Sequence, residues 1–269
     1  MITASAQDLH QPVELVCFRE AMTDQISYMD TAAATDVGVD YKRRSVAGLD
    51  LRPGQAVVDI GCGPGTDLGR LAGAVAPGGS VIGVDRDPSM LAEAGRRHAA
   101  TAGVEVRAGD IHDLPFADGS VDRARVDRLL QHVGDPQSAI GEVRRVLRPG
   151  GLFGMAEPDW DTLAVADDDV ATSRAFARFV AGRVRNATIG RDLPRLCARA
   201  GFRVRAVEPI PVLFRDFGMA DRLLGLRRNA DRAVEAGVLL DAVAADFMGR
   251  LAAGPLMAGF TLYLVTAEG

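Results

Sequence analysis

The spacing of hydrophobic residues divides the chain into a regular middle and two less regular flanks. Between residues 56 and 156, short β-branched runs alternate with longer stretches of helical periodicity. The apolar runs predict five strands, at 56–60, 81–84, 104–108, 121–126 and 152–156. The periodic stretches between them predict three helices, at 66–76, 88–102 and 138–147. Such alternation is typical of an α/β fold in which helices cover both faces of a parallel sheet.

The two flanks are mainly helical. Before the first strand, the pattern predicts helices at 12–34 and 39–49. Beyond Trp160 it predicts further elements: helices at 170–184 and 191–200, a strand at 203–213, a mostly helical stretch at 220–253 and a last strand at 255–267. Two strands separated by an added helical stretch, at the end of a parallel sheet, indicate an appended antiparallel hairpin.

Composition excludes several classes of protein. The 269 residues are 48% hydrophobic and 25% charged, as in an ordinary globular protein. With a net charge of −5 and 5% aromatic residues, we expect no nucleic-acid partner. The chain opens without a secretory signal pattern, and no apolar stretch approaches the ~18 residues of a membrane span, so we expect a cytoplasmic protein without membrane contact. Three distant cysteines, Cys17, Cys62 and Cys197, predict neither disulfides nor a metal site.

A glycine loop is the strongest chemical signal. The strand at 56–60 runs into Gly61-Cys62-Gly63-Pro64-Gly65 and then a helix, so backbone N–H groups would approach a ligand beyond the end of the sheet. Thr66 stands where a dinucleotide-binding fingerprint has its last glycine. Asp59 at the strand end would repel phosphates. The loop therefore favours a cationic or amine-bearing ligand.

Two more carboxylates stand at matching strand ends. Asp85 closes the second strand, where an acid binds both hydroxyls of a ribose, and Asp110 follows the third, placed to accept from an adenine amine. Each alone is also explained as a turn or helix cap. Together with Asp59 and the glycine loop, they indicate an adenosine that carries a positive centre and no phosphate.

At this point the chain resembles the class I S-adenosylmethionine-dependent methyltransferases. The resemblance rests on residues 57–66, 81–85, 109–116, 120–122 and 142–151 and closely covers about 49–156. It implies a doubly wound, Rossmann-like methyltransferase fold with a seven-stranded, mostly parallel sheet, one antiparallel strand and a helical cap. It also implies S-adenosylmethionine as cofactor, S-adenosylhomocysteine as product and no metal.

By the family pattern, the methionine part of the cofactor would contact Asp59, Gly61 and Gly63, with Cys62 between the glycines as a small filler rather than a nucleophile. Asp127, just past the fourth strand, would hold the ligand's amino end.

The other half of the cofactor has its own residues in the family pattern. Asp85 would bind the ribose, Asp110 and the Ile111 amide the adenine, and Arg86 would lie along the adenine face.

The resemblance narrows further to small-molecule methyltransferases of bacterial specialised metabolism, such as antibiotic biosynthesis. Residues 129–133 (Leu-Leu-Gln-His-Val) and 157–160 (Glu-Pro-Asp-Trp) carry it. Those enzymes often have His-His where this chain has Gln131-His132, so His132 is the remaining candidate for a base, oriented by Asp159 or Asp161. A helix-start histidine with a structural hydrogen bond is the alternative.

Three residues are candidates for the substrate side: Trp160, Tyr28 and Asn186. Each has a structural alternative, namely a lid-to-core joint for Trp160, ordinary packing for Tyr28 and a helix cap for Asn186. Apolar residues of the predicted cap indicate either an apolar pocket or simply core: Phe176, Phe179, Phe217, Met219, Phe247 and Met248.

We divide the chain into an N-terminal helical cap segment (1–48), a cofactor-binding core (49–160), a cap insertion (161–190) and the remaining core (191–269) with a second cap insertion at about 215–253. The predicted function is methyl transfer to a small organic acceptor by a monomer or homodimer, with O-methylation ahead of N- or C-methylation. One alternative uses the cofactor structurally while catalysing a cyclisation or rearrangement. An RNA or protein methyltransferase is the other alternative.

Overall fold

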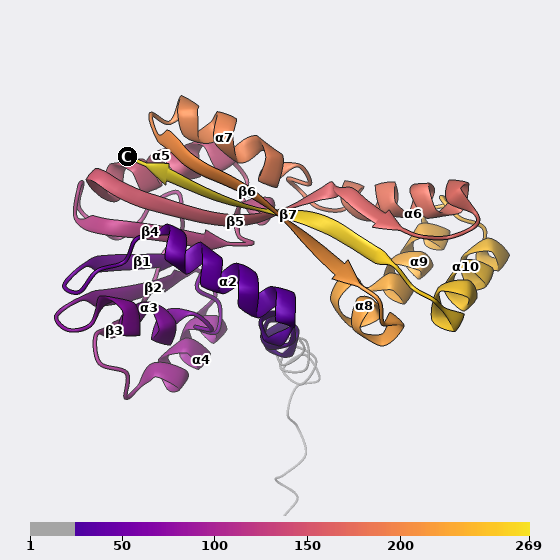
Figure 1. Ribbon diagram of the computed structural model, residues 1–269, viewed down its shortest axis with the longest axis horizontal. Helices are drawn as coiled ribbons and strands as arrows, with labels where there is room; N and C mark the ends of the chain where they lie inside the picture. The colour runs from indigo at the N-terminus through magenta and orange to yellow at the C-terminus, as the bar shows by residue number, and fades with distance from the viewer. Residues whose placement is uncertain (1–24) are drawn as a thin grey trace, which may run out of the picture.

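The computed structural model describes residues 25–269 and has two lobes that share three long strands (Figure 1). Its strands are β1 (Ala56–Ile60), β2 (Ser80–Asp85), β3 (Val104–Ala108), β4 (Val121–Asp127), β5 (Leu147–Val165), β6 (Arg203–Phe214) and β7 (Ala258–Glu268). They form one seven-stranded sheet in the order β3-β2-β1-β4-β5-β7-β6. Only β7 runs antiparallel to its neighbours, which confirms the predicted Rossmann-like methyltransferase sheet and its terminal hairpin.

Helices cover both faces of the sheet in the larger lobe, here named the core lobe. Residues 25–34 are helical. The other helices are α2 (Asp36–Gly48), α3 (Leu68–Val75), α4 (Pro88–His98), α5 (Pro136–Val146), α6 (Val170–Gly182), α7 (Ile189–Arg199), α8 (Phe217–Leu224), α9 (Leu226–Glu235) and α10 (Asp241–Ala253). One apolar cluster joins α3 and α4 to the sheet, and another joins α5 and α7 to its opposite face. None of these helices has the length and apolar run that a bilayer crossing requires.

Local sequence signals explain where the helices begin. Asp87 accepts a hydrogen bond from the Ser89 amide (2.9 Å) and precedes Pro88, the first residue of α4. Asp135 caps α5 in the same way ahead of Pro136, so α5 starts two residues before the predicted position. A proline suits the first turn because its missing N–H has no partner there anyway. Cys17 and most of the predicted helix at 12–34 lie outside the described residues.

The smaller lobe, named the cap lobe, differs from the prediction in being only partly helical. It contains α6, α8, α9 and α10 together with the outer ends of β5, β6 and β7 (Figure 1). Strand β5 is 19 residues long instead of the predicted five, because Val165 still pairs with Ala258 of β7 far from the core lobe. The predicted boundary at residue 160 therefore falls inside a strand.

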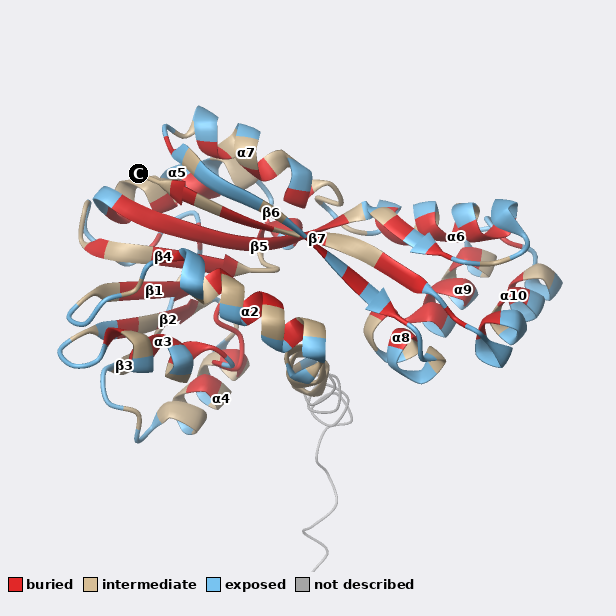
Figure 2. Cartoon of the chain, viewed as in Figure 1, coloured by how far each residue is buried: buried red, intermediate tan, exposed pale blue. Residues whose placement is uncertain are grey.

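The cap lobe has a hydrophobic core of its own. Figure 2 shows buried residues in both lobes. Phe176 and Phe247 are fully buried and meet edge to face at 5.5 Å. Partly buried side chains, Phe179, Phe217 and Met248, pack against this core. Met219 is exposed. Apart from Met219, these residues form core, and none of the six lines the cavity described below, which corrects one of the two expectations for them.

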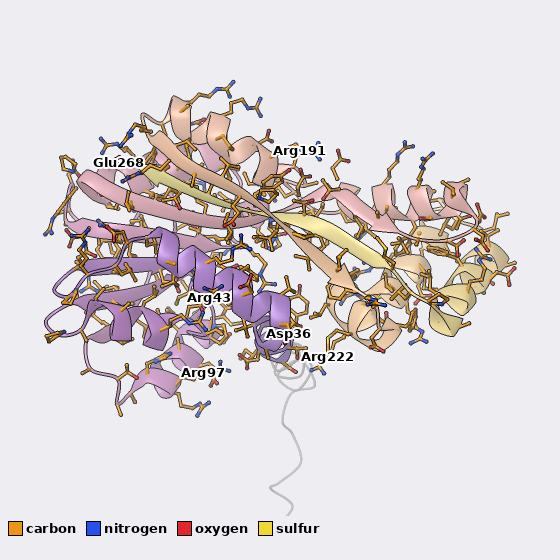
Figure 3. All side chains as sticks on the ribbon, in the orientation of Figure 1. Asp36, Arg43, Arg97, Arg191, Arg222 and Glu268 are labelled. Atoms are coloured by element: carbon orange, nitrogen blue, oxygen red, sulfur yellow. The ribbon has the colours of Figure 1, made fainter. Side chains whose placement is uncertain are left out.

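The helical residues 25–34 lie between the two lobes. Asp30 accepts two 2.8 Å hydrogen bonds from Arg97 on α4 of the core lobe. Ser27 accepts one of 2.9 Å from Arg222 on α8 of the cap lobe. Arg97 and Arg222 appear on either side of this helix in Figure 3. The N-terminal segment therefore covers the opening between the lobes.

Candidate functional site

A cavity of about 690 Å³ lies where the carboxyl ends of the core strands meet the cap lobe. Its volume is within the range of small-molecule sites. One side, named the polar half, is lined by six aspartates: Asp59, Asp67, Asp85, Asp87, Asp110 and Asp127. The other side, named the apolar half, is lined by Val184, Val212, Phe214, Leu223, Leu224, Phe260 and Leu262. An apolar pocket in the cap was one of the two predictions, but the sequence analysis named none of these wall residues for it.

The glycine loop turns tightly at the floor of the polar half. Gly61 and Gly63 have positive φ angles of 69° and 54°, which favour glycine. A Cβ on Gly61 would meet Leu129 at 2.8 Å. The loop amides donate inward: Gly61 and Cys62 to Val84 O (2.7 and 3.0 Å), and Gly63 to Asp85 Oδ2 (2.9 Å). This corrects the expectation that these N–H groups face a ligand, and it argues further against a phosphate site.

The carboxylates predicted for the nucleoside lie at the cavity rim. Asp85 is half-buried and accepts from the amides of Gly63 (2.9 Å) and Asp87 (3.0 Å), but it pairs with no arginine or lysine among residues 25–269. It therefore keeps lone pairs for ligand hydroxyls. Asp110 is exposed, and hydrogen bonds from the His112 amide and ring hold the pKa of its carboxyl below the ordinary value.

Arg86 and Ile111 line the same rim as these carboxylates. The structure thus brings the four residues predicted for the nucleoside together.

A buried ion network lies beneath the methionine end of the predicted site. Arg125 donates from Nη1 to Asp59 (2.8 Å) and from Nη2 to Asp67 (2.9 Å) and Asp127 (2.8 Å). Lys42 Nζ lies 2.5 Å from Asp67 Oδ2 and 2.6 Å from Asp127 Oδ2. All five side chains are at most 8% exposed. Buried charges of this kind persist only when each has a partner.

Pairing changes the expected roles of two acids. Burial raises the pKa of Asp59 to about 6 although Arg125 opposes the shift. For Asp127 burial acts in the same direction, but Lys42 and Arg125 outweigh it and hold the pKa well below the ordinary value. Asp59 is thus neutralised by Arg125, which corrects the expectation that its charge alone selects a cationic ligand. Both oxygens of Asp127 already accept from protein donors, Tyr41 among them.

Sequence reasoning missed the cations of this network. Lys42 is the only lysine of the chain. Arg125 stands between two buried apolar residues of β4, Ala124 and Val126, and is 1% exposed. A charge with buried neighbours on both sides is a signal that a buried partner is required. Asp127 is two positions away, but Asp67 and Asp59 are 58 and 66 positions away, so no local pattern identifies these two partners.

His132 lies on a short turn at the junction of the two halves. The turn is the 3₁₀ segment Leu130–His132, and the ring is accessible from the cavity. The surrounding protein, followed by the charges of Arg128 and Arg86, lowers the pKa of His132 below 6.5. The imidazole is therefore neutral at pH 7 and able to accept a proton.

Two side chains hold this turn, the buried Glu157 and the half-buried Asn186. Glu157 accepts from the amides of Leu129 (2.8 Å) and Leu130 (2.6 Å), and burial raises its pKa to about 8 against these hydrogen bonds. Asn186 Nδ2 donates to the carbonyls of Leu130 and Val133, both at 2.8 Å. Asn186 therefore fixes the turn and does not line the cavity, which corrects its predicted place on the substrate side.

The predicted partnership of His132 with Asp159 or Asp161 is wrong. Asp159 is fully buried and binds Arg191 of α7, with Arg191 Nη2 2.8 Å from Oδ1. Asp161 lies 3.2 Å from Nη1 of the same guanidinium. Arg191 is labelled beside the junction of the lobes in Figure 3. A buried carboxylate needs a cation, and α7 supplies Arg191 to Asp159.

The two aromatic candidates do line the cavity. Trp160 Nε1 donates to Gln131 Oε1 (2.7 Å), and its ring stacks on Phe260 at 4.7 Å. Trp160 thus forms a cavity wall and also joins the cap lobe to the turn. Tyr28 faces the Arg128 guanidinium, with 6.0 Å between the guanidinium carbon and the ring centre. Gln131 thus binds the tryptophan.

Comparison with known proteins matches a family described as "Methyltransferase domain" to residues 51–201. A Streptomyces fradiae protein described as "Uncharacterized 37.1 kDa protein in transposon TN4556" is 51% identical over 93% of this chain and 73% of its own length. The demethylmenaquinone methyltransferase of Symbiobacterium thermophilum is 39% identical over 52% of this chain and 51% of its own length. The chain thus spans about half of that enzyme.

Solved structures share the fold at low sequence identity. The YcgJ protein of Bacillus subtilis is 18% identical with a TM-score of 0.61, covering 84% of this chain and 97% of its own. The [4+2]-cyclase SpnF is 22% identical with a TM-score of 0.56, covering 85% and 80%. A geranyl diphosphate methyltransferase in complex with S-adenosylmethionine is 19% identical with a TM-score of 0.55, covering 85% and 84%.

Proposed function

The chain belongs to the methyltransferase domain family, as a class I S-adenosylmethionine-dependent enzyme, and from this premise we propose that it methylates a hydroxyl oxygen of a small organic acceptor. The observation that carries the proposal is a neutral His132 at the junction of a polar and an apolar half-cavity. We place the acceptor among natural-product-like molecules of specialised metabolism, and we expect the enzyme to act as a monomer or homodimer.

The residues of the polar half fit the cofactor. Asp85 retains acceptor sites for two ribose hydroxyls, and Asp110 with the Ile111 amide suits an adenine edge. The amides of the glycine loop are used internally, so the loop offers few free N–H donors. It therefore suits close contact with the methionine part of the cofactor better than it suits a phosphate. When bound, the cofactor supplies an electrophilic methyl group on a sulfonium.

The chain itself contributes orientation and a proton acceptor. Glu157 and Asn186 fix the His132 turn through four hydrogen bonds to its backbone. The cavity walls exclude water and hold the acceptor at the ~3–3.5 Å approach that an in-line displacement needs. His132 accepts the hydroxyl proton, a role typically worth 10²–10⁴-fold in rate.

The test combines labelled cofactor with site variants. Purified protein is mixed with S-adenosylmethionine labelled on the methyl group and a panel of phenols and other hydroxyl compounds. We expect label in an O-methyl product. His132→Ala should lower kcat roughly 10²–10⁴-fold while the Kd for S-adenosylhomocysteine stays within about twofold. Undiminished turnover in that variant would refute the base role.

A cyclisation is the second candidate, supported by the shared fold with the [4+2]-cyclase SpnF. In this function the cofactor is bound but no methyl group moves. The same experiment separates the two: product that forms without label, and at a rate unchanged when S-adenosylhomocysteine replaces S-adenosylmethionine, supports the cyclisation.

A further inference from the structure

Arg128 occupies a strained position directly after β4. Its φ angle of 55° is left-handed, a conformation that costs a non-glycine residue about 1–3 kcal/mol. Two hydrogen bonds hold it there: the Arg128 amide donates to Ala156 O (2.8 Å), and Gln131 Nε2 donates to Arg128 O (3.0 Å). Strain that the surroundings maintain in this way is typical of functional sites.

The guanidinium of Arg128 faces the cavity and is left without a hydrogen bond among residues 25–269. Its Nε is buried, and the nearest acid oxygen, Asp127 Oδ1, is 3.5 Å away. Arg125, two residues earlier, contrasts with it, because its terminal nitrogens are used by three aspartates. One arginine thus completes the buried network, while the other keeps its N–H donors for a ligand.

The apolar half of the cavity indicates that such a ligand also has an apolar part. Val212 and Phe214 come from β6, Phe260 and Leu262 from β7, and none of these side chains offers a polar atom. Charged and titratable groups around His132 are Arg128 and Arg86 at the cavity, Asp127 behind Arg128, and Glu157 beneath the turn. In surroundings of low polarity, a cation binds an oxygen anion more strongly than it does in water.

We propose that Arg128 binds the acceptor oxygen in its anionic form, and that the acceptor is an apolar molecule with an acidic hydroxyl, a phenol or an enol. This inference rests on the proposed function. The hydroxyl proton passes to the neutral His132 imidazole, and Arg128 stabilises the oxygen anion. The O–CH₃ bond then forms as the S–CH₃ bond breaks with its electron pair remaining on sulfur. His132 returns its proton to solvent.

The test measures binding and ionisation without turnover. The probes are para-alkyl ortho-nitrophenols with methyl, butyl or octyl chains, whose visible absorbance reports the phenolate. They are titrated into the full chain with S-adenosylhomocysteine present, over a range of pH. We expect affinity to rise at least about tenfold from methyl to butyl. We also expect the bound phenol to ionise at a pH about one unit or more below that of the free probe.

Variants then assign the effect to the guanidinium. Arg128→Gln should abolish the shift in phenol ionisation, and Arg128→Lys should retain part of it. If Arg128→Gln fails to fold, Arg128→Asn replaces it, because asparagine tolerates the left-handed backbone. The matched control is Arg144→Gln on α5, another arginine over an aromatic ring (5.9 Å from Phe202) but outside the cavity lining, which should keep the full shift.

Three outcomes would overturn the inference. The first is an unchanged shift in Arg128→Gln. The second is wild-type affinity independent of chain length. The third is a loss of S-adenosylhomocysteine affinity in Arg128→Gln with normal binding of 5′-methylthioadenosine, which lacks the amino acid, since Arg128 would then hold the cofactor's carboxylate. If instead the wild type binds no S-adenosylhomocysteine and transfers no methyl group, the proposed function itself fails.

Discussion

The two halves of the cavity satisfy their charges in opposite ways. In the polar half, Lys42 and Arg125 neutralise three buried aspartates before any ligand arrives. In the apolar half the walls come mainly from β6, β7 and α8, and a charge stands at its edge, on Arg128 near the neutral His132. The preformed ion network holds the cofactor site rigid. The apolar walls with few charges, by contrast, select the acceptor by its polarity and charge. Cofactor binding and acceptor choice should therefore respond to different substitutions.

Arg125→Leu should have the largest effect, because it leaves Asp59 without its hydrogen-bonded cation. Asp67 and Asp127 would keep Lys42, with Arg128 at 3.5 Å from Asp127. We expect the free energy of unfolding in urea at pH 7 to fall by about 3–5 kcal/mol, as for other buried pairs that lose a partner. Arg107→Leu is the control, since its ion pair with Glu105 lies at the surface and should contribute about 1 kcal/mol or less. Equal losses in the two variants would contradict the buried network.

Glu157→Gln tests the support of the acceptor turn through pH. The pKa of Glu157 is about 8 in the folded protein against an ordinary 4.5, so the folded state keeps a proton that the unfolded chain releases. This contribution to stability is complete below pH 4.5 and is lost as pH rises through 8. At about 1.4 kcal/mol per pKa unit, the loss reaches up to about 5 kcal/mol.

Glutamine keeps an oxygen acceptor for the Leu129 and Leu130 amides but does not titrate. Unfolding free energies of Glu157→Gln should therefore decline less than those of the wild type between pH 5 and 8. Parallel curves for the two proteins would show that Glu157 is ionised in the native state.

Asp85→Ala acts on ligand binding alone. Since Asp85 forms no ion pair among the described residues, its loss should leave the fold intact, as judged by circular dichroism. The Kd for S-adenosylhomocysteine should rise at least about tenfold, equivalent to about 1.4 kcal/mol, by calorimetry. Asp118→Ala, an exposed acid paired with Arg145, serves as control and should leave the Kd unchanged. Unaltered affinity in Asp85→Ala would refute the ribose assignment.

Phe260→Leu should have the smallest effect on stability, and it tests whether the two halves of the cavity act independently. It removes the stacking on Trp160, a contact worth about 1 kcal/mol of stability. The Kd for S-adenosylhomocysteine should remain within about twofold, while affinity for butyl and octyl nitrophenols falls. A parallel fall in cofactor affinity would mean that the halves are coupled. Leu213→Ala, at an exposed position of β6, provides the baseline.

The sequence predicted what depends on neighbouring residues. Apolar runs located β1 and β3 to the residue, and strand-end positions placed Asp85 and Asp110 at one rim. These features are local, since a strand, its turn and the next helix lie within about twenty residues. The methyltransferase fold then followed from how such units assemble.

Tertiary contacts were beyond the same reasoning. Asp159 was expected to orient His132, but it binds Arg191, which is 32 residues away in the sequence. The supports of the His132 turn, Glu157 and Asn186, are also distant in sequence and fold onto it from β5 and the segment before α7. An apolar pocket was predicted, but its wall residues were not, because most of them lie at the ends of strands whose full length was not visible in the periodicity.

The ribbon of β6 and β7 stays in unbroken antiparallel register from Ala206–Thr266 to Phe214–Ala258, across the junction of the lobes. Side chains alternate between faces with a period of two. Adding two residues to each strand would therefore move the cap outward by roughly 7 Å while every wall residue kept its orientation. Lengthening these strands in steps of two residues would thus enlarge the cavity for longer acceptor molecules, and the buried ion network of Lys42 and Arg125 would not need to change.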